Sequence, residues 1–483
     1  MRQKSIPLSA NKEEGLLYEE VAARLAHLIE QGTYRPGERI PSVRQMSSQQ
    51  QVSISTVLQA YYLLEERGLI EARPQSGYYV HMRLPSSQPE LEMSSPMPDP
   101  TQVSVHELTM MVLRDSNNPN LVQLGAAVPN LNLLATEKLN RIIANLGREL
   151  GVQSGLYIVP PGLEGLRTQI AKRAVLAGCD LTAGDIVITS GCLEAVDLCL
   201  RAVCKPGEIV AIESPIYFGM LQTLEMHGLK ALEIPTHPRD GISLNALRFA
   251  IEHNPVRACL VLSNFNNPLG SCIPTENKKE LVELLARHDI PLIENNVIGE
   301  IYHTEQRPTV AKAFDRKGLV MLCSSFSKDL CPGYRLGWVV GGRFRQTIEW
   351  LKYTSSVASA TLPQMAVAQF LEGGGYEHHL RRIRREYARN VAQVSQAVLR
   401  SFPAGTRVSR PSGGFILWVQ MPDRVDSLEL YKLSKREDIT LTPGYLFSTS
   451  NQFRNFVRIN AADWSYQIQK ALETLGGMVA ELA

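Results

Sequence analysis

Three features that would assign the chain to a special compartment are absent from its sequence. No uncharged apolar run of about eighteen residues occurs among its 483 residues, so we expect no membrane span. No opening segment combines a basic end, a long apolar middle and a small-residue cleavage site, so we expect no secretion. The eight cysteines form no C-x-x-C pair, which is unlike a metal site and typical of a reducing compartment. We therefore predict a cytoplasmic protein without a metal site.

The sequence also lacks an excess of charge of either sign. Its 50 Lys and Arg residues are nearly balanced by 48 Asp and Glu residues, and residues 1–83 alone contain ten basic and nine acidic residues. Charge therefore supplies no argument for nucleic-acid binding, which would have to be inferred from motifs. The length and the 44% hydrophobic content are those of a globular chain with at least two domains.

A segment rich in proline and serine divides the chain at about residues 84–104. Because proline fixes φ and lacks a backbone donor, this segment is predicted to be an extended linker. The alternative is a long surface loop inside one domain, but the hydrophobic periodicity changes across the segment. We predict a small helical domain at residues 12–82, a linker at 83–115 and a large domain at 116–483.

The first domain has apolar residues at helical spacing, followed by two short β-rich runs. Ser42 and Ser53 stand where helix N-caps belong, and the turn at residues 74–77 can join two strands. The predicted elements are helices at 16–30, 42–50 and 54–67 and strands at 70–73 and 78–81. This order is that of a winged helix-turn-helix.

Three motifs in this domain, Pro41-Ser42-Val43-Arg44, residues 52–57 and residues 76–80, resemble those of the GntR family of bacterial regulators in the same order. The resemblance implies binding to a double-stranded DNA operator. It implies that Arg44, Ser55 and Thr56 contact phosphates or base edges, and that the wing at Ser76 and Gly77 enters the minor groove. A dimer that reads two half-sites would compensate for the low charge of one module. The alternative is a protein–protein interaction module.

The large domain alternates between continuous apolar runs and helical patterns. The predicted strands are residues 185–189, 208–213, 258–262, 291–294, 319–323 and 336–340, with helices at about 194–203 and 217–227. This alternation predicts a mostly parallel α/β sheet that is covered on both faces. Ligands bind such sheets at the carboxyl ends of the strands.

A lysine follows one of these strands in the motif Ser324-Ser325-Phe326-Ser327-Lys328, and Arg335 follows seven residues later. A lysine amine can condense with an aldehyde to a Schiff base, and hydroxyls with an arginine can hold a phosphate. Pyridoxal phosphate (PLP) carries both groups, and we predict it as the cofactor.

Other candidate residues follow the neighbouring strands, and each has a structural alternative. The amides of Gly191, Cys192 and Leu193 could hold a phosphate at a helix N-terminus or form an ordinary turn. Tyr217 could stack on a flat ring or fill the core, and Asn267 could donate to a ring oxygen or hold a turn. Arg458 could bind a carboxylate through two donors or form a salt bridge within a strand.

These residues, in this order, resemble those of fold-type I aminotransferases over roughly residues 120–480. The resemblance implies a Schiff base at Lys328 and a cofactor phosphate bound by Ser325, Arg335, residues 191–193 and Tyr157 of a partner subunit. It further implies a cofactor ring stacked on Tyr217 and bonded to Asn267, a substrate carboxylate on Arg458, and a homodimer. The whole chain resembles the MocR-type branch of GntR regulators, and residues 72–80 resemble its YdcR-type members.

Two positions depart from the aminotransferase pattern. Asn295 stands where those enzymes place an aspartate under the pyridine nitrogen, and Ile298 stands where they place a tyrosine. Without a carboxylate the ring nitrogen is protonated less readily, so α-proton removal should be slow while covalent capture at Lys328 survives. We predict a transcription regulator that senses PLP, or an amine or amino acid through a PLP–Lys328 aldimine, with weak or no transamination. The alternatives are an active aminotransferase with a DNA-binding appendage and a domain that has lost PLP and only dimerises.

Overall fold

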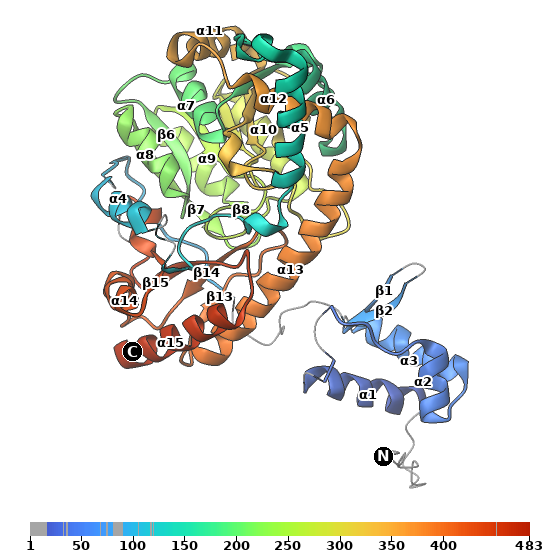
Figure 1. Cartoon of the computed structure of the whole chain (residues 1–483). Coiled ribbons are helices and arrows are strands. Elements are labelled where there is room, and N and C mark those ends of the chain that lie inside the picture. Colours follow the sequence, from blue (N-terminus) through green and yellow to red (C-terminus); the bar gives the residue numbers. More distant parts are fainter. Residues whose placement is uncertain are drawn as a thin grey trace. The chain divides into compact units, whose positions relative to one another are not determined.

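The computed structural model describes residues 17–31, 33–34, 37–67, 69–73, 76–80, 90–104, 106–115, 118, 120–450 and 452–483. The chain divides into two units, with the boundary between Ser87 and Gln88. The small unit contains three helices and a hairpin, and the large unit is built around a sheet (Figure 1).

The first unit has the predicted elements in the predicted order. They are α1 (Leu17–Glu30), α2 (Val43–Gln50), α3 (Ile54–Glu66), β1 (Ile70–Arg73) and β2 (Gly77–Val80). Ser42 and Gln45 form a reciprocal capping box at the start of α2, and the Ser53 side chain accepts the Thr56 amide at the start of α3. The fold prediction for this domain is confirmed.

Aliphatic residues and one tyrosine hold these helices together. Leu25, Val57 and Leu64 are fully or almost fully buried, so α1 and α3 pack closely. Tyr61 is also buried, and its hydroxyl donates to the Pro41 carbonyl oxygen at 2.7 Å. This bond fixes α3 against the start of α2, which is the contact that a helix-turn-helix requires.

The second unit is built on a long, mostly parallel sheet whose main path runs β3-β7-β6-β9-β10-β11-β12-β5. The strands are β3 (Thr101–Gln102), β7 (Lys230–His237), β6 (Ile209–Ser214), β9 (Val256–Val261), β10 (Leu292–Asn295), β11 (Val320–Ser325), β12 (Gly337–Val340) and β5 (Ile186–Thr189). The neighbours from β7 to β11 are parallel, whereas β12 is antiparallel to both β11 and β5. The mostly parallel sheet is as predicted, although β7 was not predicted.

Helices cover both faces of this sheet (Figure 1). One face is covered by α7 (Cys192–Val203), α8 (Phe218–Met226) and α11 (Arg345–Ser356). The opposite face is covered by α9 (Leu244–His253) and α10 (Thr275–Arg287), and each face has its own hydrophobic core. The strands are continuously apolar because both of their faces are buried.

A smaller lobe follows the long helix α13 (Gly375–Ser401), which runs along one side of the large unit in Figure 1. Its antiparallel sheet has the order β13 (Arg407–Val408), β14 (Ile416–Gln420), β17 (Phe456–Asn460) and β16 (Thr442–Pro443). Two helices, α14 (Ser427–Ser434) and α15 (Tyr466–Leu482), complete the lobe. The lobe brings β17, and with it Arg458, toward the large sheet.

The predicted linker at residues 83–115 is too long. Residues 90–104 lie on the second unit: Leu91 and Val103 are buried, and β3 pairs with β7. The Ser94 hydroxyl also accepts the Thr236 amide at 2.9 Å. The helix α4 (His106–Asp115) then reaches the site described below. Prolines do not prevent this packing because an edge segment needs few backbone donors. Residues 83–89 lie outside the described residues.

Candidate functional site

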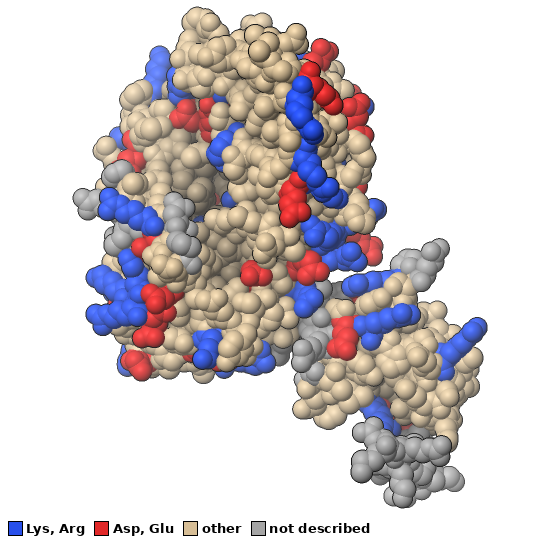
Figure 2. Space-filling view, in the orientation of Figure 1, with Lys and Arg blue, Asp and Glu red and all other residues tan. Residues whose placement is uncertain are grey.

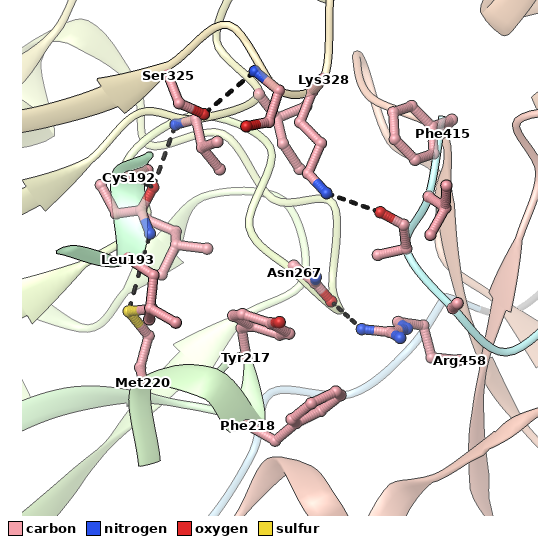
Figure 3. Close-up of a pocket in the computed structure, with 18 of the residues that line it drawn as sticks. Cys192, Leu193, Tyr217, Phe218, Met220, Asn267, Ser325, Lys328, Phe415 and Arg458 are labelled. Atoms are coloured by element: carbon pink, nitrogen blue, oxygen red, sulfur yellow. Dashed lines mark hydrogen bonds between the residues drawn. The ribbon is translucent and has the colours of Figure 1, made fainter. Parts of the chain in front are cut away.

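A cavity of about 280 Å³ lies in the second unit at the carboxyl ends of β5, β10 and β11. The hollow between the lobes is visible in Figure 2, and Figure 3 shows the side chains that line the cavity. Most of the predicted cofactor and substrate residues line it together: Cys192, Leu193, Tyr217, Asn267, Asn295, Ser325, Lys328, Arg335 and Arg458. Gly191 directly precedes the helix that carries two of them.

Lys328 follows β11 and points into the cavity (Figure 3). Its Nζ atom donates to the Ala127 carbonyl oxygen at 2.8 Å. Burial, reinforced by the charges of Arg458 and Arg335, lowers the pKa of the Lys328 amine to about 8. The fraction of neutral amine at physiological pH is therefore far larger than for an exposed lysine, and the neutral amine is the form that attacks an aldehyde.

Arg335 and the turn before α7 lie together at one end of the cavity, where the sequence predicted phosphate ligands. Gly191 has a φ of 97° and is the N-cap of α7, and a Cβ atom there would collide with the Arg335 guanidinium. Arg335 donates to the Ser190 carbonyl oxygen at 3.2 Å and to Ser327 Oγ at 3.4 Å. Ser325 lies beside them, since its Oγ atom accepts the Ser327 amide at 3.3 Å. Free amides at a helix N-terminus next to a guanidinium are suited to a phosphate dianion.

Asn295 ends β10, and its amide occupies the predicted position in the cavity. Its Oδ1 atom accepts the Cys192 thiol at 3.3 Å and the Val297 amide at 3.1 Å. Its Nδ2 atom faces the Met220 sulfur at 3.8 Å. No Asp or Glu side chain is among the described residues that line the cavity. The cavity therefore offers a neutral amide where aminotransferases use a charged carboxylate.

The neighbouring Glu294 does not replace the missing carboxylate. It points away from the cavity and accepts bonds from Ser263, Ala311 and Lys312 on the other face of the sheet. Burial raises the pKa of Glu294. Ile298, at the second departing position, is buried and contributes only hydrocarbon to the lining.

Arg458 is a buried cation without a carboxylate partner among the described residues. Its guanidinium donates to the Gly125 carbonyl oxygen at 2.7 Å and to Asn267 Oδ1 at 3.2 Å, while its Nε atom has no partner there. It lies 5.5 Å from the Phe218 ring centroid and 5.2 Å from that of Phe447. Burial lowers the pKa of Arg458 to about 10. A buried guanidinium with an unused donor is an incomplete site for an anion.

The donor set fits PLP. Among the described residues, the lining contains three cationic side chains, those of Lys328, Arg335 and Arg458, and no anionic side chain. A phosphate dianion and a ligand carboxylate would balance these charges. Tyr217 borders the cavity beside Phe218 and offers a flat face for an aromatic ring (Figure 3).

Tyr157 does not join this group within one chain. It is 79% exposed and is not part of the cavity lining. This exposure agrees with the predicted role, which requires that the tyrosine reach the site of a partner subunit, but it does not test that role.

Sequence reasoning missed the apolar part of the lining. These residues are Val112 and Leu113 of α4, Ala126 to Val128, Phe218 and Phe415. They come from four separate segments and resemble ordinary core residues in the sequence. Only the packing of the chain brings them together.

The first unit presents the predicted DNA-contact residues at its surface. Arg44 on α2 and Ser55 at the start of α3 are exposed, and Thr56 is half-buried. The Ser53 hydroxyl lies 2.7 Å from the hydroxyls of both Ser55 and Thr56. The amino end of α3 therefore carries three hydroxyl groups, which suit phosphate oxygens or base edges.

The wing residues have a defined geometry as well. Gly77 has a φ of 105°, where a side chain would be strained and would crowd Arg39. The Ser76 hydroxyl bonds to the Tyr79 hydroxyl at 2.7 Å. On the face in view in Figure 2, the Lys and Arg side chains of this unit are dispersed rather than gathered in one patch. Their dispersal agrees with the balanced charge of this part of the sequence.

The family comparisons match both units. Residues 17–80 match the model for bacterial regulatory proteins of the GntR family, and residues 120–475 match the model for aminotransferase class I and II. The chain is 39% identical to the HTH-type transcriptional regulator YjiR of Escherichia coli, over 96% of this chain and 98% of that protein. It is 37% identical to YdcR of the same organism, over 96% and 99%.

Solved structures show the same fold for the second unit. The α-aminoadipate aminotransferase LysN of Thermus thermophilus superposes with a TM-score of 0.72 at 24% identity, covering 78% of this chain and 96% of that one. A kynurenine aminotransferase of Pyrococcus horikoshii superposes with a TM-score of 0.73 at 24% identity, covering 79% and 95%. These likenesses confirm the predicted fold-type I architecture.

The described residues also contain neither a metal-binding cluster nor a membrane-spanning helix. They contain no cluster of His, Cys, Asp and Glu that could hold a metal ion. No helix among them is long and apolar enough to span a membrane. With matches to both family models and to regulators along nearly its full length, the chain belongs to the MocR-type HTH transcriptional regulators, in which a GntR domain precedes an aminotransferase class I and II domain.

Proposed function

We propose that this regulator binds a DNA operator through its first unit and is controlled by PLP, or by an amine or amino acid that reaches PLP in the second unit. The observation that carries the proposal is the combination of an accessible, partly neutral Lys328 with a neutral Asn295. Such a site can capture an aldehyde and an amine but is poorly equipped to consume the amine. The protein would act in the cytoplasm.

Each cavity residue has a distinct task in this proposal. Lys328 bonds to the cofactor, while Arg335, Ser325 and the amides of residues 191–193 hold its phosphate. Tyr217 stacks on the ring and Asn267 donates to the ring oxygen. PLP, when bound, supplies an aldehyde that captures primary amines and a ring that withdraws electrons from them. Arg458 orients the carboxylate of an amino-acid ligand.

Asn295 is the reason for expecting little turnover. Its amide can hydrogen-bond but brings no negative charge to favour a protonated ring nitrogen. When the pKa of the ring nitrogen falls by one unit, the carbanion that is left after loss of the α-proton is stabilised less by about 1.4 kcal/mol. A fall of two or three pKa units would slow removal of the α-proton by orders of magnitude.

A homodimer would complete both sites. Large apolar side chains are exposed on the second unit around Tyr157, namely Val152, Leu156, Val159, Trp350 and Tyr353. Val159, Trp350 and Tyr353 line one open depression, which suits contact with a second copy. A dimer would place Tyr157 at a partner's phosphate site and two winged units on two half-sites.

The proposal is tested by sequencing the genomic DNA fragments that the full-length protein retains, with and without PLP and a panel of amines. A defined set of fragments whose retention changes with PLP or with an amine is expected for the wild type. Lys328→Ala should retain the same fragments without that response. An unchanged profile for the PLP-loaded wild type under every condition would contradict control by the second unit.

A further inference from the structure

The cavity around Lys328 has two chemically different sides. Figure 3 places Cys192 and Leu193 on one side of the lysine and Arg458 and Phe415 on the other. The first side carries the turn at residues 191–193, which suits the cofactor phosphate. The second side must therefore receive whatever ligand joins the cofactor.

The second side is mostly apolar, with Arg458 and its hydrogen-bond partner Asn267 as polar side chains. Hydrocarbon side chains from three segments form its wall, namely Val112, Leu113, Ala126, Ala127, Val128 and Phe415. The guanidinium itself lies near the rings of Phe218 and Phe447. Among the described lining residues, this wall contains no carboxylate and no second cation.

We propose that the cavity selects α-amino acids with an apolar, uncharged side chain. This inference rests on the proposed function and specifies its ligand. The ligand amine meets the cofactor at Lys328, its carboxylate meets the Arg458 guanidinium, and its side chain lies on the apolar wall.

Other ligand classes leave charges unpaired. A second carboxylate, as in glutamate, would be buried against hydrocarbon with no cation to receive it. A basic side chain would enter a site that already holds three cations and no anion. An amine without a carboxylate would leave Arg458 buried and without an anion. Each mismatch should lower affinity by at least tenfold, since unpaired buried polar groups discriminate strongly.

The test is a titration of the PLP-loaded full-length protein, followed by cofactor absorbance and by thermal shift. The ligands are L-leucine, L-methionine, L-glutamate, L-lysine and isopentylamine, which is leucine without its carboxylate. Leucine and methionine should bind at least tenfold more tightly than the other three. Equal or tighter binding of glutamate, lysine or isopentylamine would overturn the inference while leaving amine sensing intact. If none of the five changes either signal although PLP is bound, both the inference and sensing of amines are wrong.

Val128 allows a test by gain of binding. Its side chain lines the cavity but is 45% exposed, so it can be replaced without opening a buried core. Val128→Lys should shift the ratio of glutamate to leucine affinity toward glutamate by about tenfold. Val128→Gln has similar length without the charge and should not favour glutamate. A ratio unchanged in Val128→Lys would show that the ligand side chain does not reach this wall.

Discussion

At the scale of single residues, the proposal depends on Lys328, Arg458 and Asn295. Burial lowers the pKa values of Lys328 and Arg458, and neither contacts a carboxylate among the described residues. Asn295 is satisfied by the Cys192 thiol and the Val297 amide, so it is a stable part of the cavity. Binding and turnover can therefore be separated by substitution.

The first prediction concerns the pH dependence of PLP capture. Because the pKa of Lys328 is lowered to about 8, the neutral amine increases with pH up to that value and is saturated above it. The rate at which apo protein gains cofactor absorbance should rise about tenfold per pH unit well below 8 and level off near 8. With a lysine of ordinary pKa, the rate of capture would continue to rise up to about pH 10.

Arg458 provides the control for this profile, since its charge helps to lower the pKa of Lys328. Arg458→Met should move the levelling point to higher pH, provided that circular dichroism shows an intact fold. Lys328→Ala should show no covalent capture at any pH. A wild-type rate that does not change between pH 6 and 8 would contradict the assignment.

The second prediction is that Asn295→Asp restores activity. An aspartate at this position favours a protonated ring nitrogen, so transamination of a bound amino acid should rise at least tenfold. The gain should be lost in the double variant with Lys328→Ala. The measurement is keto-acid formation from the amino acid, and a variant no faster than the wild type would show that Asn295 is not what limits turnover.

At the scale of elements, continuous apolar runs and cap residues made most of the fold predictable. Strands β5, β6, β9, β10, β11 and β12 are buried on both faces and therefore stand out in the sequence. Strand β7 does not, because Glu233 and Pro235 interrupt it, although Glu233 is buried and bonded to Ser448 and Thr449. Lys328 and Arg335 could be predicted because both lie in the short connection between β11 and β12, where the sequence forms one motif. The apolar wall could not, because α4 and residues 126–128 reach it only through tertiary packing.

The third prediction concerns the cap of α3. Ser53 accepts the Thr56 amide at 3.1 Å and contacts the Ser55 and Thr56 hydroxyls at the start of that helix. Ser53→Ala should destabilise α3 by about 1 kcal/mol and weaken DNA binding through Ser55 and Thr56. Ser53→Thr keeps the capping oxygen and should restore both. Hydrogen exchange over residues 54–66 and operator affinity are the measurements, and unchanged exchange in Ser53→Ala would rule out this role of the cap.

At the scale of the whole molecule, two units with separate cores share one chain. The first unit alone has little net charge, so a single copy should bind DNA weakly. Exposed apolar residues near Tyr157 offer a surface by which two second units could bring two first units together. Dimer formation would then complete the cofactor site through Tyr157 and fix the spacing between two half-sites of the operator.

The fourth prediction tests this surface. Trp350 is 64% exposed, and Trp350→Glu should shift the full-length protein from dimer to monomer in sedimentation velocity. Affinity for DNA with two half-sites should fall along with PLP retention. Met226→Glu removes an apolar residue that is 71% exposed elsewhere and should change neither property. A Trp350→Glu protein that stays dimeric would place the interface on another surface.

The central claim is that the protein binds an amino acid through PLP without transaminating it at an enzyme's rate. The most direct test is to add an amino acid to the PLP-loaded wild-type protein and to follow cofactor absorbance and keto-acid release together. We predict a prompt change in absorbance that is absent in Lys328→Ala, with keto acid forming far more slowly than about one turnover per second, the low end for enzymes. Keto acid released as fast as the absorbance changes, at an enzyme's rate, would contradict the account.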